Sequence, residues 1–460
     1  MAIQSTYSPI DGRLVVEREL ADGSRISRAI SLARNAQKSW KQVPLADRIA
    51  ICQAFADRML SRKQSLGEEI TVQMGRPIRY TPNEIVGMAD RTRVMCELSR
   101  SVLANVELPP LDGFLRFIKR EPVGIVFAIV PWNYPYLTAV NTVIPALLAG
   151  NAVVLKHSPQ TPLCGERIQE ALLEAGLPEG VFQVLHLSVE DTEAILRSSE
   201  VDFVAFTGSV AVGHSIQRTV SDRFVGVGLE LGGKDPAYVR ADADLGFAAE
   251  NLVDGACFNS GQSCCAIERI YVDEKVFDEF VERAVAVTNQ YQLGDPTNPS
   301  VTLGPMVRAS SADFVRGQIS DAVQAGASTL IEESAFPAST VGTPYLAPQL
   351  LVNVNHSMSL MRDESFGPVV GIMKVKSDAE AIALMNDSAF GLTASIWTRD
   401  LDASISIGDQ IQAGTIFMNR CDYLDPMLPW VGVKDSGRGC TLSQFGFDQL
   451  TRPKGYHLRK

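Results

Sequence analysis

One cysteine of the chain stands in a setting that suits a nucleophile. Cys264 ends the segment Phe258-Asn-Ser-Gly-Gln-Ser-Cys264, a loop rich in Gly and Ser that can expose the sulfur and surround it with backbone N–H groups. A thiolate is an intrinsically strong nucleophile. Because no neighbour in the sequence is an evident activating base, a buried structural cysteine is the alternative for this residue alone.

A candidate general base precedes a flexible glycine pair. Glu230 stands between Leu229 and Leu231, directly before Gly232-Gly233, so a carboxylate is offered from the end of an apolar strand. Partial desolvation there would raise its pKa towards neutrality, as a general base requires. A solvated or ion-paired glutamate is the alternative.

A side-chain amide is the third candidate. Asn133 lies in Pro131-Trp-Asn-Tyr-Pro135, a rigid loop that follows an apolar stretch. Together with the backbone N–H of Cys264 it could hold the oxygen of a tetrahedral intermediate, and the loss of one such donor typically costs about 2.7 to 4 kcal/mol. An asparagine that satisfies only the backbone of its turn is the alternative.

The segment Gly208-Ser-Val-Ala-Val-Gly213 is a candidate phosphate-binding turn. It follows an apolar strand and opens a helix, which is where parallel sheets bind phosphate-bearing ligands. Because it is not a GxGxxG sequence, a plain strand-to-helix turn is the alternative.

The elements that position these residues alternate between strand and helix. The first alternation predicts strands at 123–130, 152–156, 182–185 and 203–206, and helices at 136–148, 163–175 and 190–198. The second runs from about 233 to 429, with helices at 245–257, 275–291, 309–325, 378–386 and 401–411, and strands at 269–272, 328–331, 369–374, 394–398 and 415–418. Helices on either side of Pro44 precede them, and 113–120 reads as a strand. This pattern predicts an α/β fold of two doubly wound domains.

Composition excludes several classes of protein. The 460 residues are 46% hydrophobic and 21% charged with a net charge of −11, which indicates a globular chain without an extended nucleic-acid surface. The apolar stretch 137–149 is interrupted by Asn141 and Pro145 and is too short for a membrane span, and no secretory signal is evident, so we expect a cytoplasmic protein. The spacing of the eight cysteines and five histidines predicts neither disulfides nor a metal site.

The motifs in this order resemble the aldehyde dehydrogenase superfamily, in particular its semialdehyde dehydrogenase-like branch, over essentially the whole chain. The resemblance rests also on Leu229-Glu-Leu-Gly-Gly-Lys234, Glu364-Ser-Phe-Gly-Pro368 and Gly432-Val-Lys434-Asp-Ser-Gly437. It implies that an aldehyde is oxidised to a carboxylate by NAD or NADP through a thioacyl enzyme. Cys264 would be the nucleophile, Asn133 the oxyanion donor, and Glu230 the residue that activates water.

The resemblance also implies a cofactor site and an assembly. The cofactor would lie against Trp132, Lys156, Pro159, Gly208, Ser209, Gly213, Glu364 and Phe366. The implied domains are a cofactor-binding Rossmann-like domain at 1–108 and 124–230, a catalytic domain at 231–431, and a small β oligomerisation element at 109–123 and 432–460. The last element predicts a homodimer or homotetramer.

Two departures from the family pattern bear on chemistry. Family members often carry an acid three residues after the cofactor lysine, where this chain has Pro159, so the choice between NAD and NADP stays open. A lysine and a glutamate that relay protons in many relatives are replaced by Thr142 and Thr441.

Two other functions are alternatives. A cysteine-dependent esterase or amidase without redox chemistry would use Cys264, Asn133 and Glu230, and a catalytically silent binding protein would use none of them. The identity of the aldehyde stays open, because Asp422 and Asp425 favour an amino-aldehyde whereas Arg420 favours a semialdehyde.

Overall fold

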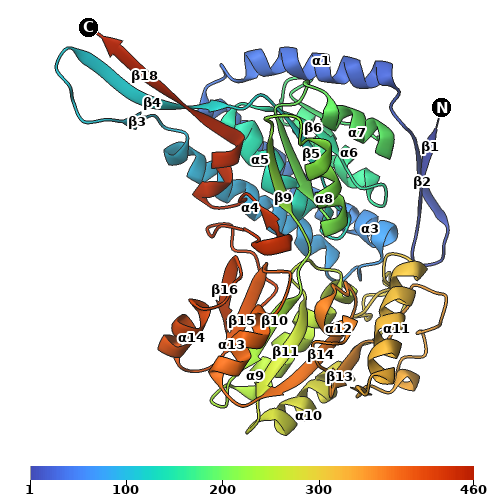
Figure 1. Cartoon of the computed structure of the whole chain (residues 1–460). Coiled ribbons are helices and arrows are strands. Elements are labelled where there is room, and N and C mark those ends of the chain that lie inside the picture. Colours follow the sequence, from blue (N-terminus) through green and yellow to red (C-terminus); the bar gives the residue numbers. More distant parts are fainter. Residues whose placement is uncertain (1) are drawn as a thin grey trace.

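The computed structural model describes residues 2–460, which form two α/β units and a projecting β arm (Figure 1). The first unit contains a six-stranded sheet of order β17-β9-β8-β5-β6-β7, which is parallel except for β17. Its strands are β17 (Gly437–Arg438), β9 (Gly226–Glu230), β8 (Phe203–Thr207), β5 (Ile125–Ile129), β6 (Ala152–Lys156) and β7 (Phe182–Val184). The carboxyl ends of β6, β8 and β9 therefore lie at one edge of this sheet.

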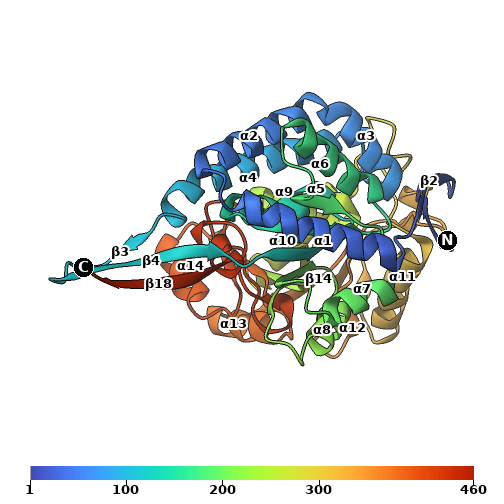
Figure 2. The same ribbon diagram turned by 90° about the horizontal axis from the view of Figure 1, so that it is seen from above.

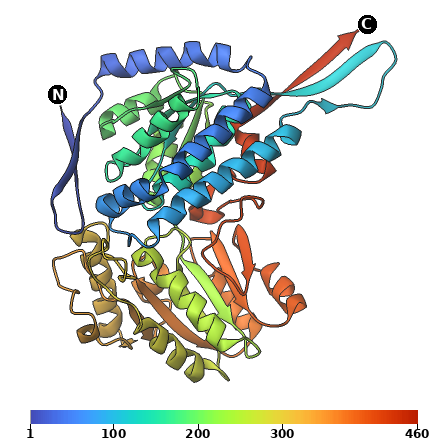
Figure 3. The same cartoon turned by 180° about the vertical axis from the view of Figure 1, so that it is seen from behind.

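Helices cover both faces of the first sheet, as Figures 1 and 3 show from opposite sides. One face packs against α1 (Gly23–Trp40), α7 (Val189–Arg197) and α8 (Val210–Thr219). The other packs against α2 (Leu45–Ser61), α3 (Lys63–Met74), α4 (Thr81–Val102), α5 (Pro135–Ala149) and α6 (Pro162–Glu174). Along β5, Ile125 and Phe127 enter the first core while Val126 and Ala128 enter the second. Burial on both faces explains why this strand is a continuous apolar run in the sequence.

The second unit contains a seven-stranded sheet of order β12-β13-β14-β11-β10-β15-β16, with only β12 antiparallel to its neighbour. Its strands are β10 (Asp235–Val239), β11 (Ile267–Asp273), β12 (Ser328–Thr329), β13 (Gln349–Val352), β14 (Val369–Val375), β15 (Thr393–Trp397) and β16 (Thr415–Met418). Its helices are α9 (Leu245–Cys257), α10 (Phe277–Thr288), α11 (Ala309–Gln324), α12 (Ser359–Arg362), α13 (Asp378–Asn386) and α14 (Leu401–Gly408), with short 3-10 turns η1 (Phe258–Gly261) and η2 (Glu333–Ala335). Two more 3-10 turns, η3 (Lys434–Ser436) and η4 (Gln444–Leu450), lie in the C-terminal segment. The predicted α/β class is confirmed.

The arm is formed by β3 (Val106–Glu107), β4 (Phe114–Pro122) and β18 (Thr451–Arg459), and it extends away from both units (Figure 2). β18 pairs with β4 along its whole length, from Thr451 opposite Pro122 to Arg459 opposite Phe114. The aromatic rings of Phe117 and Tyr456 stack across this pair at 4.5 Å. The other edge of β18 pairs with no strand of residues 2–460.

The C-terminal segment at 432–460 contributes to two parts of the structure. Residues 437–438 extend the first sheet beside β9, and Phe447 and Leu450 of η4 enter the core between this sheet and helices α2–α6. Only β18 belongs to the arm. The exact domain boundaries stay a prediction.

An N-terminal hairpin, β1 (Ile3–Tyr7) with β2 (Leu14–Glu19), completes the fold. The hydroxyl of Thr6 donates to the carbonyl of Pro159 at 2.7 Å, so this hairpin is tied to the turn that follows β6. Within residues 2–460, every helix is too short or too polar to cross a membrane.

Candidate active site

The loop that carries Cys264 is fixed by its own amide side chains. It begins in η1, where Asn259 and Ser260 adopt left-handed backbone angles, with φ of 53° and 56°. The amide of Gln262 accepts a hydrogen bond from the Val307 N–H at 2.7 Å and donates one to the Asn259 carbonyl at 3.0 Å. The loop is thereby held in a conformation that non-glycine residues adopt at an energetic cost.

Two adjacent cysteines differ in access. Cys264 is partly exposed, whereas Cys265 is only 2% exposed and donates from Sγ to Oδ1 of Asp422 at 3.0 Å. The hydrogen bond with Cys264, together with burial, raises the pKa of the Cys265 thiol. Cys264 is therefore the thiol of this pair that a small molecule can reach.

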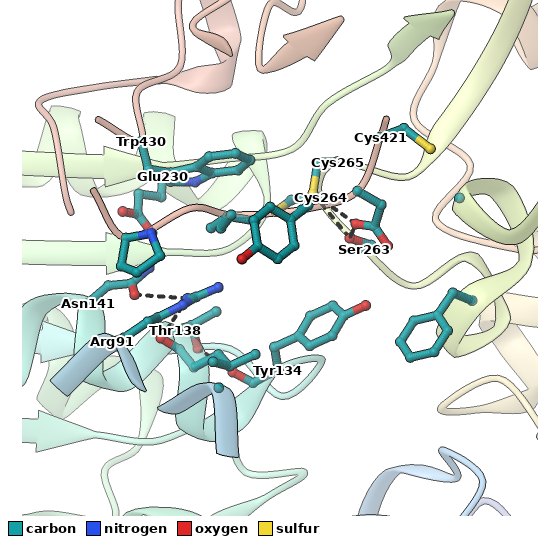
Figure 4. A pocket seen from close by; sticks show the side chains of 18 of the residues that line it. Arg91, Tyr134, Thr138, Asn141, Glu230, Ser263, Cys264, Cys265, Cys421 and Trp430 are labelled. Carbon is teal, nitrogen blue, oxygen red and sulfur yellow. Dashed lines mark hydrogen bonds between the residues drawn. The ribbon is translucent and has the colours of Figure 1, made fainter. Parts of the chain in front are cut away.

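A cavity of about 480 Å³ opens beside Cys264 (Figure 4). Its lining comes from α4, α5, α9, the cysteine loop and the segment before η3, and includes Arg91, Tyr134, Glu230 and Trp430. Two helices of the first unit, with Glu230 at the end of β9, and three segments of the second unit thus enclose one space. A volume of this size suits a small organic molecule.

Glu230 ends β9 at the wall of this cavity. One carboxylate oxygen, Oε2, accepts from the Thr207 hydroxyl at 3.1 Å, and the other, Oε1, accepts from the Thr441 hydroxyl. Burial raises the pKa of Glu230, and the two hydroxyl donors oppose that rise by stabilising the carboxylate. A carboxyl group whose pKa lies above its usual range accepts a proton more readily than an exposed glutamate does.

Asn133 lies behind the cysteine loop and is 5% exposed. Its Nδ2 donates to the carbonyl of Gln262 at 3.2 Å, and its own carbonyl accepts from Nδ2 of Asn259 at 3.2 Å. The fold therefore brings the side-chain amide of Asn133 against the residues that directly precede Cys264.

A buried ion pair fixes the Asn133 loop relative to the cysteine loop. Nη1 of Arg76 lies 2.6 Å from Oε2 of Glu84, and both side chains are almost inaccessible. Arg76 also donates to Oδ1 of Asn259 at 3.0 Å and to the carbonyl of Asn133. The other oxygen of Glu84 accepts from the N–H of Tyr136 at 2.8 Å, at the start of α5. One pair therefore anchors the Asn133 loop, the η1 turn and the first turn of α5.

A second cavity, of about 300 Å³, lies on the other side of the cysteine loop. Trp132, Gln262, Glu364 and Phe366 line it, and the rings of Trp132 and Phe366 meet edge to face at 5.8 Å. Gln262 faces this second cavity while Cys264 lines the first. The loop from Gln262 to Cys264 thus separates the two spaces.

The turn that presents Glu364 and Phe366 rests on another buried ion pair. Nζ of Lys234 contacts Glu268, whose oxygens accept from the N–H groups of Ser365 and Phe366 at 2.8 and 2.9 Å. Phe366 has a left-handed φ of 50°. Burial, with repulsion from Glu268, raises the pKa of Glu364 to about 8. At neutral pH this carboxyl group is therefore protonated in most of the molecules.

The remaining predicted cofactor residues lie at the carboxyl edge of the first sheet. Lys156 ends β6, and burial lowers the pKa of its amine. Ser209 is the N-cap residue of α8, and a Cβ on Gly213 would approach the Leu231 side chain at 2.7 Å, so the glycine lets α8 pack closely against the residue that follows β9. The open N-terminus of α8 and the cation of Lys156 suit the phosphates of a dinucleotide.

Cys264 and Glu230 line the larger cavity, and Asn133 lies against the loop between the cavities. The predicted cofactor residues lie around the second cavity or at the carboxyl edge of the first sheet. The structure also reveals residues that the sequence did not. Arg76, Glu84 and Arg91 were not predicted. Each lies on α4 or just before it, more than 120 residues from Cys264, and helical periodicity alone marks no role for them. Thr142 and Thr441 line a small pocket next to Glu230.

Comparison with known proteins agrees with this geometry. Residues 2–455 match the profile of the Aldehyde dehydrogenase family. The chain is 34% identical to the mitochondrial aldehyde dehydrogenase of Leishmania tarentolae, over 98% of this chain and 90% of that protein. It is 31% identical to succinate-semialdehyde dehydrogenase [NADP(+)] 1 of Mycobacterium bovis, over 98% of both. The crystal structure of an NAD-dependent aldehyde dehydrogenase from Sinorhizobium meliloti superposes with a TM-score of 0.95 at 33% identity, over 100% of this chain and 92% of that one.

Proposed function

The chain belongs to the aldehyde dehydrogenase family, and we propose that it oxidises an aldehyde to a carboxylate with NAD or NADP through a thioester on Cys264. The resemblance inferred from the motifs is thereby confirmed. One observation carries the assignment of the nucleophile: Cys264 is the accessible thiol on the loop that separates two cavities. A thiol in that position can meet an aldehyde from one side and a cofactor from the other.

The first step is addition of the Cys264 thiolate to the aldehyde carbonyl within the larger cavity. The developing oxyanion needs donors that are already aimed at it. We assign these to the side-chain amide of Asn133 and the backbone N–H of Cys264. The Arg76–Glu84 pair supports the assignment because it fixes the Asn133 loop before the substrate arrives.

The residues around the smaller cavity fit a dinucleotide. Trp132, Glu364 and Phe366 would enclose the nicotinamide end, and Gly208, Ser209, Gly213, Lys156 and Pro159 would surround the phosphates and the adenosine ribose. When bound, NAD or NADP accepts the hydride that converts the adduct on Cys264 to a thioester. A Cβ on Gly232 would approach the Glu364 carboxylate at 2.3 Å, so the small residue there keeps this carboxyl group at the cavity wall.

Glu230 completes the reaction by activating water. Its partly buried carboxylate at the wall of the aldehyde cavity can take a proton from a water molecule that attacks the thioester. The proton would then pass through the hydroxyls of Thr441 and Thr207, which both bond to Glu230. Thr142 lines the same small pocket, so this route needs no lysine and glutamate pair.

A cysteine hydrolase without redox chemistry is not favoured. Such an enzyme would need Cys264, Asn133 and Glu230, but it would not need the second cavity or the charged groups around it. The family match points the same way.

We also propose a homodimer or homotetramer in the cytoplasm. The long free edge of β18 supports the assembly, since an exposed edge of that length otherwise invites nonspecific pairing.

The direct test is the appearance of reduced cofactor when an aldehyde and NAD or NADP are added. Replacing Cys264 with Ser should lower kcat by at least about a thousandfold, because an alcohol is a much poorer nucleophile than a thiolate. Cys265→Ser is the matched control and should keep appreciable turnover, because Cys265 is buried against Asp422. Full activity of Cys264→Ser with loss of activity in Cys265→Ser would contradict the assignment.

The pH dependence of kcat should report Glu230. The Thr441 hydroxyl stabilises the carboxylate and lowers the pKa of Glu230, so Thr441→Val should raise that pKa and leave less of the base ionised. The acidic limb of the profile should move to higher pH. A hydrogen bond to a charged group is worth about 1.5 kcal/mol, which corresponds to about a tenfold loss of kcat on the acidic side.

The control for this change is Thr441→Ser, which keeps the hydroxyl and should leave the profile in place. An acidic limb that does not move in Thr441→Val would show that Thr441 does not tune the base.

Cofactor choice should depend on position 159. An acid there would bond the free adenosine ribose and repel a 2′-phosphate, which Pro159 cannot do, and the buried Lys156 amine gains an anionic partner from that phosphate. We therefore expect NADP to be accepted at least as well as NAD. Pro159→Glu should shift the ratio of kcat/KM towards NAD by at least about tenfold, or roughly 1.4 kcal/mol.

Pro159→Gln separates charge from shape and should change the ratio little. A wild-type enzyme that is more than about a hundredfold selective for NAD, with the same selectivity in Pro159→Glu, would refute this account of the cofactor site.

A further inference from the structure

The aldehyde cavity contains a guanidinium that the oxidation chemistry does not use. Arg91 projects from α4 into the cavity and is only 8% exposed (Figure 4). Its Nη1 donates to Oδ1 of Asn141 at 2.9 Å and to the carbonyl of Leu137 at 3.2 Å, both on α5. These bonds fix the orientation of the guanidinium relative to the wall.

The opposite edge of the guanidinium has no partner. Both hydrogen bonds of Arg91 use Nη1, and among residues 2–460 neither Nε nor Nη2 donates to another atom. This edge presents two parallel N–H groups, the geometry that binds a carboxylate through two hydrogen bonds. Arginine keeps its charge when buried, so the cavity holds a cation with one unsatisfied face.

The carboxylates around the cavity are engaged elsewhere. Oδ1 of Asp422 accepts from Ser263 at 2.9 Å and from Cys265, and Glu230 accepts from two threonines. Asp90 and Asp254 also line the cavity, but both side chains are exposed to solvent. None of these four forms an ion pair with Arg91 within 4 Å. Glu230 and Glu84 act on the guanidinium only at longer range, so no carboxylate of residues 2–460 occupies its free edge.

We propose that the preferred substrate carries a carboxylate at the end remote from its aldehyde, and that the free edge of Arg91 binds this carboxylate. The inference rests on the proposed function, because it orients such a semialdehyde with its carbonyl at Cys264. A buried guanidinium with unpaired N–H groups is energetically unfavourable, and the substrate carboxylate removes that penalty only when it is present. Arg91 is then the specificity-determining residue, and a neutral aldehyde of the same length gains nothing from it.

A different role for Arg91 would be to stabilise the ionised form of Glu230, which its charge favours at a distance. The two roles predict different kinetics. A counterion of Glu230 changes the pH dependence for every aldehyde, whereas a substrate-binding residue changes KM only for aldehydes that carry a carboxylate.

The test compares 4-oxobutanoate and 5-oxopentanoate with their methyl esters, which have the same aldehyde but no charge. The wild-type enzyme should favour the better of the two acids over its ester by at least about tenfold in kcat/KM. Arg91→Gln should lose at least about tenfold in kcat/KM for that acid, mainly through KM, and change less than about threefold for the ester. Arg91→Lys should keep part of the preference, because an ammonium supplies charge without the two-pronged geometry.

Arg420→Gln is the matched control. Arg420 is exposed, packs over the ring of Tyr423 and does not line the aldehyde cavity. Its replacement should therefore leave the preference for the acid over the ester unchanged. Competition by glutarate against an ester substrate in the wild-type enzyme, with no effect of neutral glutaramide, tests the same contact without any variant.

Equal losses for acid and ester in Arg91→Gln, or a moved acidic limb with an unchanged acid preference, would overturn the inference. So would wild-type enzyme that oxidises acid and ester equally and is not inhibited by glutarate. Failure to reduce cofactor with any of these aldehydes would instead contradict the proposed function.

Discussion

The buried ion pair between Arg76 and Glu84 is the constraint on which the rest of the site depends. Its two side chains reach from the start of α4 to three backbone segments: the Asn133 loop, the η1 turn and the first turn of α5. Removing one partner of such a pair typically costs about 3 to 5 kcal/mol, because a buried charge is left alone. The pair also joins the two α/β units, since Arg76 belongs to the first and Asn259 to the second. The position of Cys264 relative to Asn133 thus depends on a buried ion pair.

The buried Lys234–Glu268 pair fixes the backbone in the same way beside the proposed cofactor cavity. It holds the turn at Ser365 and Phe366 against the start of the second sheet and keeps Glu364 at the cavity wall. Between the two anchored regions lies the Gln262–Cys264 loop, which is stabilised by the Gln262 amide. Rigid backbone on both sides of a single thiol suits this reaction, since the thiolate of Cys264 and the hydride acceptor must both reach the carbonyl carbon of the aldehyde.

Local patterns in the sequence predicted the α/β class and most helices, because each of those signals lies within a few neighbouring residues. The same patterns made Cys264, Glu230 and Asn133 candidates, and the resemblance of their motifs to a family assigned the roles. The strand β10 was not predicted, since Pro236 interrupts its apolar run, and β13 and the polar hairpin β1–β2 were not predicted either. The sequence did not reveal the roles of Arg76, Glu84 and Arg91 for a different reason. Their partners are distant in sequence, and charged residues on a helix normally face solvent, so only the folded chain shows that these are buried.

The central claim is that Cys264 carries the acyl group before Glu230 acts on water. Rapid mixing of Glu230→Gln with an aldehyde and cofactor tests it most directly, followed by mass analysis of the peptide that contains Cys264. The account predicts a burst of reduced cofactor close to one equivalent per active site, slow subsequent turnover, and an acyl group attached to Cys264. The absence of a burst, with hydride transfer slowed as much as steady-state turnover, would contradict the order of steps and the role of Glu230.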